Sequence, residues 1–489
     1  MRYGLRLAVL ALAAGASQAH AAGPEAEDGG LAMESCELLV PGTPLSVAGQ
    51  CGWLDVAENP DEPQGRHIRV RVARVPAHGR VAEPDPLVFF AGGPGQAATE
   101  TWPIVARALR KVNESRDILL VDQRGTGQSN PLKCPRVELE QALVSDWDQL
   151  AEATRECLDG VDGDPRYYTT TIAMGDIDAA RAALGYDKVN LYGGSYGTRA
   201  AQVYLRLYPD RVRTVVLDGV VPQTLALGAE HAQKLDQSIH RVLRTCDSDP
   251  KCGDTFPGTD EKLAGLVRQL ERSPVEVTVP HPTTGKPFSL TFDRETLASS
   301  LRFLSYSSDS QSMLPLLISE AATGGHFERL ASQMLIAATG LQESIAQGME
   351  MSVVCSEDYP WYPKDVDLSR YLMGNVMLKS ADIQCGIWPA GPVPANFHDP
   401  VVSDVPTLLL SGELDPVTPP EYAAEVASHL GNAMQLVAPG QGHIVTTRGC
   451  MGDLVSQFII EASFENLDTG CISQMQYTPY FLSLTGPTP

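Results

Sequence analysis

Residues 188–207, KVNLYGGSYGTRAAQVYLRL, constrain the fold of this chain more than any other stretch. Residues 189–192 are typical of the end of a buried strand, and residues 198–208 predict a helix that stops at Pro209. The Gly-Gly-Ser-Tyr-Gly sequence between them fits a turn so tight that the residues flanking Ser195 must be small. Such a turn raises the Ser195 hydroxyl above the sheet edge, at a helix N-terminus that favours a developing anion. We therefore predict that Ser195 is a catalytic nucleophile; the alternative is a glycine-rich turn with an incidental serine.

Residues 1–21 have the organisation of a secretory signal. Arg2 and Arg6 precede an apolar run at residues 7–16, and Ala19-His20-Ala21 matches an A-x-A cleavage site. The run is shorter than the roughly 20 residues that a membrane span needs, and no later stretch of the sequence is long and apolar enough. We predict cleavage before Ala22 and a soluble secreted or periplasmic protein without membrane insertion; a retained amphipathic anchor is the alternative.

Composition narrows the choice of partners. The chain carries 37 basic and 60 acidic residues, which gives a formal net charge of −23. This charge argues against nucleic acid and anionic membranes as partners. The 489 residues exceed an ordinary domain, so we expect either a core with a large insertion or two domains.

Ten cysteines follow the predicted signal, and an even number in an exported chain indicates disulfides. No C-x-x-C occurs and no cysteine lies near paired histidines, which argues against zinc; we expect no metal and no cofactor. The cysteines fall in successive short-range pairs. The simplest expectation is that neighbours bond, as Cys36–Cys51, Cys134–Cys157, Cys246–Cys252, Cys355–Cys385 and Cys450–Cys471.

Short apolar runs that alternate with helices predict an α/β fold with a parallel sheet covered on both faces. A β segment at residues 36–77 comes first, then runs at 86–90, 116–121, 188–192 and 212–217, with a helix at 169–184. Strand, helix and strand return at 406–410, 421–430 and 434–437. We thus predict a core formed by residues 22–225 and 401–489.

Residues 226–400 follow a different pattern and predict a mainly helical insertion. One β-hairpin is expected around Thr284-Gly285. Helices are expected at residues 230–246, 260–272, 294–306, 312–323 and 326–338.

A serine hydroxyl is a weak nucleophile that needs a base, and the base needs an orienting acid. Asp415 follows the strand at 406–410, and His443 follows the strand at 434–437, so both lie at the sheet edge where the Ser195 turn opens. The order serine, aspartate, histidine is that of the α/β hydrolases. Glu413 is the rival acid, but the turn before Pro416 favours Asp415. We interpret the nine other histidines as surface or signal residues.

Two backbone N–H groups are needed to stabilise an oxyanion. One belongs to Tyr196, the residue after the nucleophile. For the other we choose Gly93 in the turn Gly92-Gly93-Pro94-Gly95, because Pro94 has no N–H to donate. A plain Gly/Pro turn is the alternative.

These motifs resemble the α/β-hydrolase serine aminopeptidases of the prolyl iminopeptidase and secreted tripeptidyl aminopeptidase kind. The matching stretches are residues 92–95, 122–129, 193–197, 410–418 and 442–443, and residues 405–471 are similar to the terminal domain of tripeptidyl aminopeptidases. The resemblance implies an α/β-hydrolase fold, a helical cap over the site and removal of residues from free peptide N-termini. Ala91 stands where the family usually has a histidine, which leaves the oxyanion backbone intact but changes substrate positioning. We interpret Asp122, Arg124 and Asp218 as structural, with Arg124 paired to a carboxylate near the site.

An aminopeptidase needs a carboxylate that holds the substrate ammonium at a fixed distance from the serine. Glu357 and Asp358 follow the disulfide cysteine Cys355, and Trp361 is placed to form a pocket wall. The family resemblance points to Asp358, since tripeptidyl aminopeptidases show a similar Cys-x-x-Asp pattern. The alternative is that both acids are solvated loop charges.

The sequence therefore predicts a serine exopeptidase that acts on peptides with a free N-terminus. A carboxylesterase or lipase would use the same machinery, because fold and triad are shared among hydrolases of many substrates. A catalytically inactive binding protein is disfavoured by the complete set of Ser195, Asp415 and His443. Epoxide hydrolases and dehalogenases are excluded, because they would need an aspartate at position 195.

Overall fold

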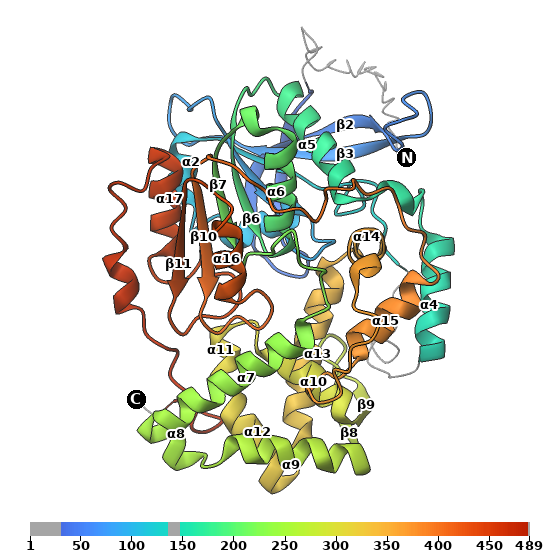
Figure 1. Ribbon diagram of the computed structural model, residues 1–489, viewed down its shortest axis with the longest axis vertical. Coiled ribbons are helices and arrows are strands. Elements are labelled where there is room, and N and C mark those ends of the chain that lie inside the picture. The colour runs from blue at the N-terminus through green and yellow to red at the C-terminus, as the bar shows by residue number, and fades with distance from the viewer. Residues whose placement is uncertain (1–30, 135–146, 488–489) are drawn as a thin grey trace, which may run out of the picture.

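The core of the protein is a nine-stranded sheet with the order β1-β2-β3-β5-β4-β6-β7-β10-β11 (Figure 1). The computed structural model describes residues 31–134 and 147–487, so the predicted signal segment lies outside it. The six strands from β5 to β11 in this order are parallel, and all but the edge strand β11 are fully or largely buried because helices cover both faces. They are β5 (Ile118–Val121), β4 (Leu87–Phe90), β6 (Val189–Gly194), β7 (Val212–Asp218), β10 (Thr407–Gly412) and β11 (Ala433–Ala438). The predicted parallel sheet is confirmed.

Three antiparallel strands extend one edge of the sheet: β1 (Glu34–Leu39), β2 (Ser46–Ala57) and β3 (His67–Val75). They form the β segment predicted at residues 36–77. In β3 the side chains of Ile68, Val70 and Val72 are buried while His67 and Arg69 are exposed, as the alternation in the sequence requires.

Two sets of helices cover the two faces of the sheet (Figure 1). One face packs against α1 (Ala98–Val105), α2 (Arg110–Ser115) and α17 (Met451–Glu461). The other packs against α5 (Thr170–Ala183), α6 (Tyr196–Leu207) and α16 (Pro420–Ala427). The predicted helix at 198–208 begins two residues earlier than expected, because the helix starts directly after the serine of the tight turn.

A mainly helical cap lies between β7 and β10 and has a hydrophobic core of its own (Figure 1). The five predicted helices and the hairpin are all present. They are α7 (His231–Ser248), α9 (Thr259–Arg272), α10 (Arg294–Leu304), α12 (Leu314–Gly324), α13 (Phe327–Ser344), β8 (Val275–Pro280) and β9 (Pro287–Phe292). The sequence did not predict the shorter cap elements α8 (Pro250–Thr255), α11 (Ser308–Gln311), α14 (Gln347–Val353), the π-helical turn Val354–Asp358 and α15 (Val376–Cys385), nor α4 (Trp147–Gly160) in the core.

All five predicted disulfides form, each between neighbouring cysteines. Cys355–Cys385 joins the π-helical turn to α15 within the cap, and Cys450–Cys471 closes the segment that carries α17. Disulfides in this number are typical of proteins outside the reducing cytosol. In the part of the chain that the structure describes, none of the helices has the length and apolar character needed to cross a membrane.

Candidate active site

Ser195 occupies a sharp turn between β6 and α6. Its φ of 56° is unusual for a residue with a side chain, and its N–H donates to the Asp218 carbonyl at the end of β7, 2.9 Å away. A Cβ added at Gly193 would lie 2.2 Å from the Gly197 carbonyl oxygen, and one at Gly197 would lie 2.3 Å from the Phe90 oxygen. Only glycine fits at these two positions, so the local sequence dictates the turn that presents Ser195.

His443 and Asp415 meet at the same edge of the sheet. Asp415 follows β10 and His443 follows β11, and His443 Nδ1 lies 2.7 Å from Asp415 Oδ2. Burial alone would lower the pKa of His443, but the charge of Asp415 and the hydrogen bond to it raise this pKa above its usual value. Burial alone would raise the pKa of Asp415, and His443 lowers it instead. The pair therefore favours an imidazolium held by a carboxylate.

Thr418 completes the surroundings of Asp415. The backbone N–H groups of Val417 and Thr418 both donate to Asp415 Oδ1 at 2.8 Å, and the Thr418 hydroxyl donates to Oδ2 at 2.7 Å. The same hydroxyl oxygen lies 3.0 Å from His443 Nδ1. The rival acid Glu413 is engaged elsewhere, because its Oε2 accepts from the Gly440 N–H and the Tyr477 hydroxyl. Asp415 thus contacts the predicted base, whereas the sequence offered no signal for Thr418.

Asp218 ties the serine turn to the histidine loop. Gly219 follows it, and a Cβ at Gly219 would lie 3.0 Å from His443 Cε1, so the imidazole lies over the end of β7, the strand that pairs with β6 just before Ser195. The buried Asp218 carboxylate accepts hydrogen bonds from the Val445 and Thr446 N–H groups, the Thr446 hydroxyl and the Tyr192 hydroxyl. These contacts fix the chain after His443, in agreement with the structural role predicted for Asp218.

The turn after β4 lies against the serine. A Cβ at Gly92 would lie 3.2 Å from the Ser195 Cβ, and the next residue, Gly93, is exposed with a φ of 104°. Within residues 31–134 and 147–487, the backbone N–H groups of Gly93 and Tyr196 donate to no protein acceptor. Both predicted oxyanion donors are thus unsatisfied in the protein and adjoin the serine.

Glu357 and Asp358 lie beneath the serine turn, with partners inside the protein. Asp358 is fully buried, and its Oδ1 accepts from Arg199 Nη1 at 2.7 Å and from the Leu227 N–H at 2.8 Å. Glu357, 1% exposed, accepts from the N–H and the hydroxyl of Thr170. Neither acid is a solvated loop charge: Asp358 contacts α6 and Glu357 contacts the start of α5. Asp358, the main carboxylate of the predicted ammonium site, is thus already paired with Arg199.

The Thr170 hydroxyl also contacts the Tyr196 hydroxyl at 2.6 Å. Thr170 therefore links the Glu357 carboxylate to the side chain of Tyr196. Burial, and then the charge of Asp358, raise the pKa of Glu357 to about 8. Burial also raises the pKa of Tyr196. Trp361, predicted as a pocket wall, is instead 62% exposed and packs on the His398 ring at 4.7 Å.

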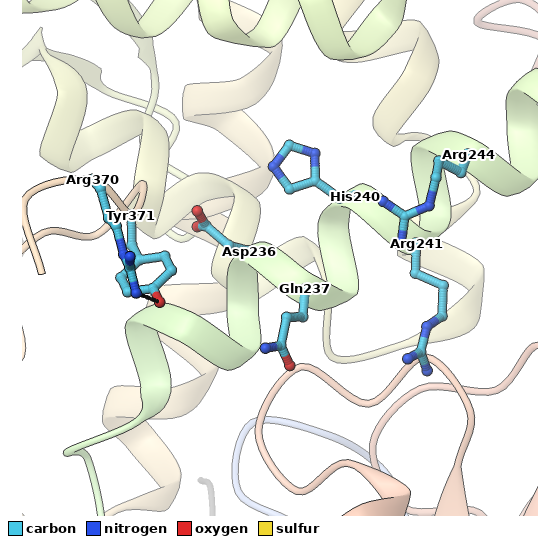
Figure 2. Close-up of a pocket in the computed structure, with 7 residues that line it drawn as sticks. All are labelled: Asp236, Gln237, His240, Arg241, Arg244, Arg370 and Tyr371. Carbon is cyan, nitrogen blue, oxygen red and sulfur yellow. Dashed lines mark hydrogen bonds between the residues drawn. The ribbon is translucent and has the colours of Figure 1, made fainter.

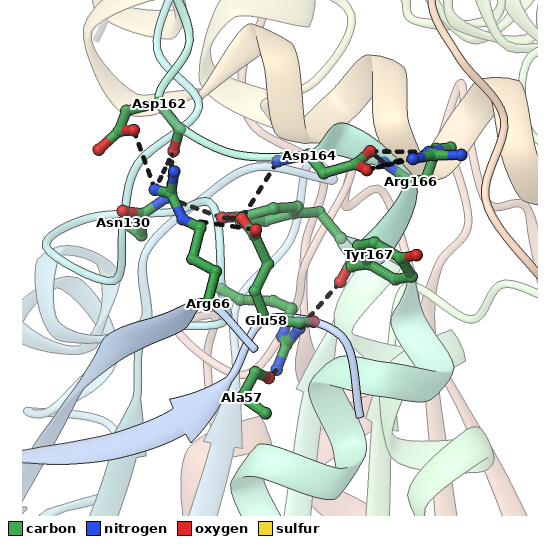
Figure 3. A network of polar contacts seen from close by, with 10 residues as sticks. Ala57, Glu58, Arg66, Asn130, Asp162, Asp164, Arg166 and Tyr167 are labelled. Carbon is green, nitrogen blue, oxygen red and sulfur yellow. Dashed lines mark hydrogen bonds and ion pairs between the residues drawn. The ribbon is translucent and has the colours of Figure 1, made fainter. Parts of the chain in front are cut away.

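Arg124 holds together the loops at the β2–β3 side of the site, and three of its partners, Ala57, Glu58 and Tyr167, are labelled in Figure 3. It forms a two-pronged ion pair with Asp176 on α5, at 2.7 and 2.8 Å, and donates to the carbonyls of Ala57, Glu58 and Tyr167. Asp122 is buried and accepts from the Thr99 N–H and hydroxyl at the start of α1. The structural interpretation of Arg124 and Asp122 is confirmed.

Four half-buried residues near the site were missed by the sequence interpretation, and we call them the Arg302 cluster: Arg302, Tyr306, His231 and Glu350. The Tyr306 carbonyl accepts from the His443 N–H at 2.8 Å, and the Tyr306 ring packs edge-on against the imidazole. Burial, then Arg302 and His443, lower the pKa of His231 to about 3. His231 is half-buried and contacts Arg302 through Nδ1, so it is not the lone surface histidine that the sequence interpretation expected.

A separate pocket of about 410 Å³ lies along α7 on the cap (Figure 2). None of the predicted site residues is among those that line it: Asp236, Gln237, His240, Arg241, Arg244, Arg370 and Tyr371. In the described part of the chain no group of three histidine, cysteine, aspartate or glutamate residues is arranged to hold a metal ion.

Comparison with known proteins gives similarities to serine peptidases. The serine protease Hip1 of Mycobacterium tuberculosis is 25% identical over 462 residues, which cover 87% of this chain and 88% of that protein. A tripeptidyl aminopeptidase of Streptomyces lividans is 31% identical over 196 residues, 35% of each chain. Among solved structures, a proline iminopeptidase of Mycobacterium smegmatis superposes with a TM-score of 0.40 at 14% identity, covering 84% of this chain and 98% of that one.

The family itself follows from a match to a family model. The model that describes the alpha/beta hydrolase fold matches residues 85–446, which include β4, the serine turn, the whole cap and the His443 loop. The sheet order and the helices on both faces agree with this match. The chain belongs to the alpha/beta hydrolase fold family.

Proposed function

We propose that this protein is an exported serine exopeptidase that cleaves peptides near a free N-terminus. The observation that carries the proposal is the position of Ser195, Asp415 and His443 after β6, β10 and β11, at the carboxyl edge of one parallel sheet, with His443 bonded to Asp415. The similarity to named serine peptidases supports a peptide substrate. The five disulfides support an oxidising compartment.

In the proposed reaction Ser195 attacks the carbonyl carbon of the scissile peptide bond while His443 takes the hydroxyl proton. Asp415 holds the imidazole through Nδ1 and stabilises its charge. The N–H groups of Gly93 and Tyr196 bind the oxyanion. His443 then gives its proton to the leaving amine, which leaves an ester on Ser195 that water hydrolyses in the same way.

The substrate ammonium requires an accessible carboxylate, and the contacts favour Glu350 over the predicted Glu357 and Asp358. Glu350 lies on α14, one turn after Ala346, whose N–H donates to the carbonyl of Gly95 in the oxyanion turn. It retains accessible surface, and burial raises its pKa to about 6. Asp358, with no accessible surface and an arginine partner, is poorly suited to receive a second cation.

The test combines a covalent probe with a substrate panel. Wild-type protein should react with a fluorophosphonate and hydrolyse aminoacyl, prolyl or tripeptidyl amides, and N-acetylation of those substrates should reduce kcat/KM at least about a hundredfold. The Ser195→Ala variant should lose both labelling and hydrolysis while it remains folded. Labelling of Ser195→Ala would refute the nucleophile. Equal hydrolysis of N-blocked and free peptides would indicate an endopeptidase instead. Hydrolysis of acyl esters but not of peptides would indicate an esterase.

A further inference from the structure

The last turn of α10 brings a cap arginine to the catalytic histidine. Tyr306 follows this helix, and its ring centroid lies 5.5 Å from that of His443 at an interplanar angle of 86°. Arg302 Nη2 lies 3.4 Å from the Tyr306 hydroxyl and 3.5 Å from His231 Nδ1. Arg302 and His443 both lower the pKa of His231, so each of them lies within electrostatic reach of the His231 imidazole.

Arg302 has only neutral partners. Besides Tyr306 and His231, its contact is with the Met377 sulfur at 3.5 Å, and within the described chain no carboxylate forms an ion pair with it. Arg294, at the other end of the same helix, shows the contrast, since it pairs with Glu271 at 2.7 Å. A half-buried guanidinium has lost part of its hydration, and long contacts to neutral groups replace little of it.

Glu350 does not neutralise this charge. Arg302 lowers the pKa of Glu350, which shows that the two groups interact, but the two side chains form no ion pair in the described structure. The site therefore presents a carboxylate and a separate guanidinium, both with accessible surface. Such a pair matches a ligand that carries an ammonium and a carboxylate at different atoms.

We propose that Arg302 binds a carboxylate on the leaving fragment of the substrate. The inference rests on the proposed peptidase function, in which His443 gives its proton to the leaving amine. The leaving fragment must therefore pass His443 and Tyr306, and Arg302 is the next group beyond the Tyr306 hydroxyl. A guanidinium binds a carboxylate through two parallel hydrogen bonds, which adds orientation to charge.

The carboxylate that Arg302 binds can come from two parts of a peptide. One is the terminal carboxylate of a short peptide that ends one or two residues after the scissile bond. The other is an aspartate or glutamate side chain on the leaving side of a longer peptide. The first makes the protein selective for short peptides, and the second makes it selective for sequence.

The experiment compares wild type with Arg302→Gln and Arg302→Lys, and uses Arg244→Gln as the control for loss of one exposed cap charge. Substrates are short peptides as free acids and as C-terminal amides, longer amidated peptides with glutamate or glutamine after the scissile bond, and an aminoacyl anilide without a carboxylate. Arg302→Gln should reduce kcat/KM about tenfold to a hundredfold for the carboxylate substrates only, through KM, with partial recovery in Arg302→Lys. Arg244→Gln should match wild type. The free acid and the glutamate peptide distinguish the two sources.

A second measurement does not depend on turnover. Calorimetric titration of Ser195→Ala with matched acid and amide peptides should give tighter binding of the acid, and adding Arg302→Gln should remove the difference. Equal binding of acid and amide to Ser195→Ala would overturn the inference, as would an equal loss of activity on all substrates in Arg302→Gln. If wild type hydrolyses esters but no peptide or anilide, the peptidase function fails, and the titration then decides separately whether Arg302 selects carboxylates.

Discussion

The buried Asp358–Arg199 pair offers the sharpest test of how the serine turn is supported. Both side chains have no accessible surface, and Asp358 Oδ1 lies 2.7 Å from Arg199 Nη1. Arg199 lies on α6, one turn after Ser195, and otherwise donates only to the carbonyls of Pro222 and Leu225. The Asp358→Asn substitution keeps the shape and the bond from the Leu227 N–H but leaves the guanidinium charge uncompensated.

Removal of one partner from a buried ion pair costs about 3–5 kcal/mol, because the other charge stays in a medium that solvates it poorly. For a chain of this size the midpoint of thermal unfolding should fall by about 3–5 °C. Hydrolysis of free peptides and of simple acyl esters should decline in parallel, since both depend on the Ser195 turn.

The matched control removes both charges. Arg199→Met with Asp358→Leu should recover most of the lost stability, less about 1–3 kcal/mol for the Leu227 N–H that loses its acceptor. Thermal unfolding and kcat/KM for a free tripeptidyl amide and an acetyl ester are measured on all three proteins. A stable Asp358→Asn protein that loses only the hydrolysis of free N-terminal peptides would refute this reasoning and restore Asp358 as the ammonium ligand.

Three further predictions concern the groups around the triad. Thr418→Val should reduce kcat about tenfold with little change in KM, because Asp415 loses a hydroxyl donor while its bond to His443 remains; unchanged kcat contradicts this. The pH profile of kcat/KM should rise through a pKa above 6.5, because His443 must be neutral to act as the base and Asp415 raises its pKa; a midpoint below 6.5 contradicts this. Glu357 has a folded-state pKa of about 8 against 4.5 unfolded, so it keeps its proton on folding and stability falls as pH rises between these values. Glu357→Gln should flatten that slope in denaturant titrations and keep the bond from the Thr170 N–H. An unchanged slope would show that other groups cause the pH dependence.

The features that were predictable are those encoded over a few residues. Gly193 and Gly197 allow one turn only, apolar runs mark buried strands, and parallel strands bring the residues after them to one edge. That logic located Asp415 and His443 from more than 200 positions away in the sequence. Neighbouring cysteines paired as expected, because short loops keep their ends close.

The features that were not predictable depend on contacts between distant segments. An acidic residue in a chain of net charge −23 gives no sign that an arginine 159 positions earlier will neutralise it, as Arg199 does for Asp358. The same holds for His231, whose place beside His443 depends on how the cap packs against the core. Sequence patterns report burial and turns, but the partner of a charge depends on the packing between segments.

The contacts around Tyr306 imply that the cap and the catalytic base form one mechanical unit. The His443 N–H donates to the Tyr306 carbonyl, and a Cβ at Gly442 would lie 2.5 Å from that same oxygen, so the base loop is packed directly on the cap backbone. On the core side, Asp218 holds the residues that follow His443. A displacement of α10 would therefore move the imidazole relative to Ser195. We infer that the cap orients the His443 imidazole, and a cap that opened independently of the core would first have to break the bond between the His443 N–H and the Tyr306 carbonyl.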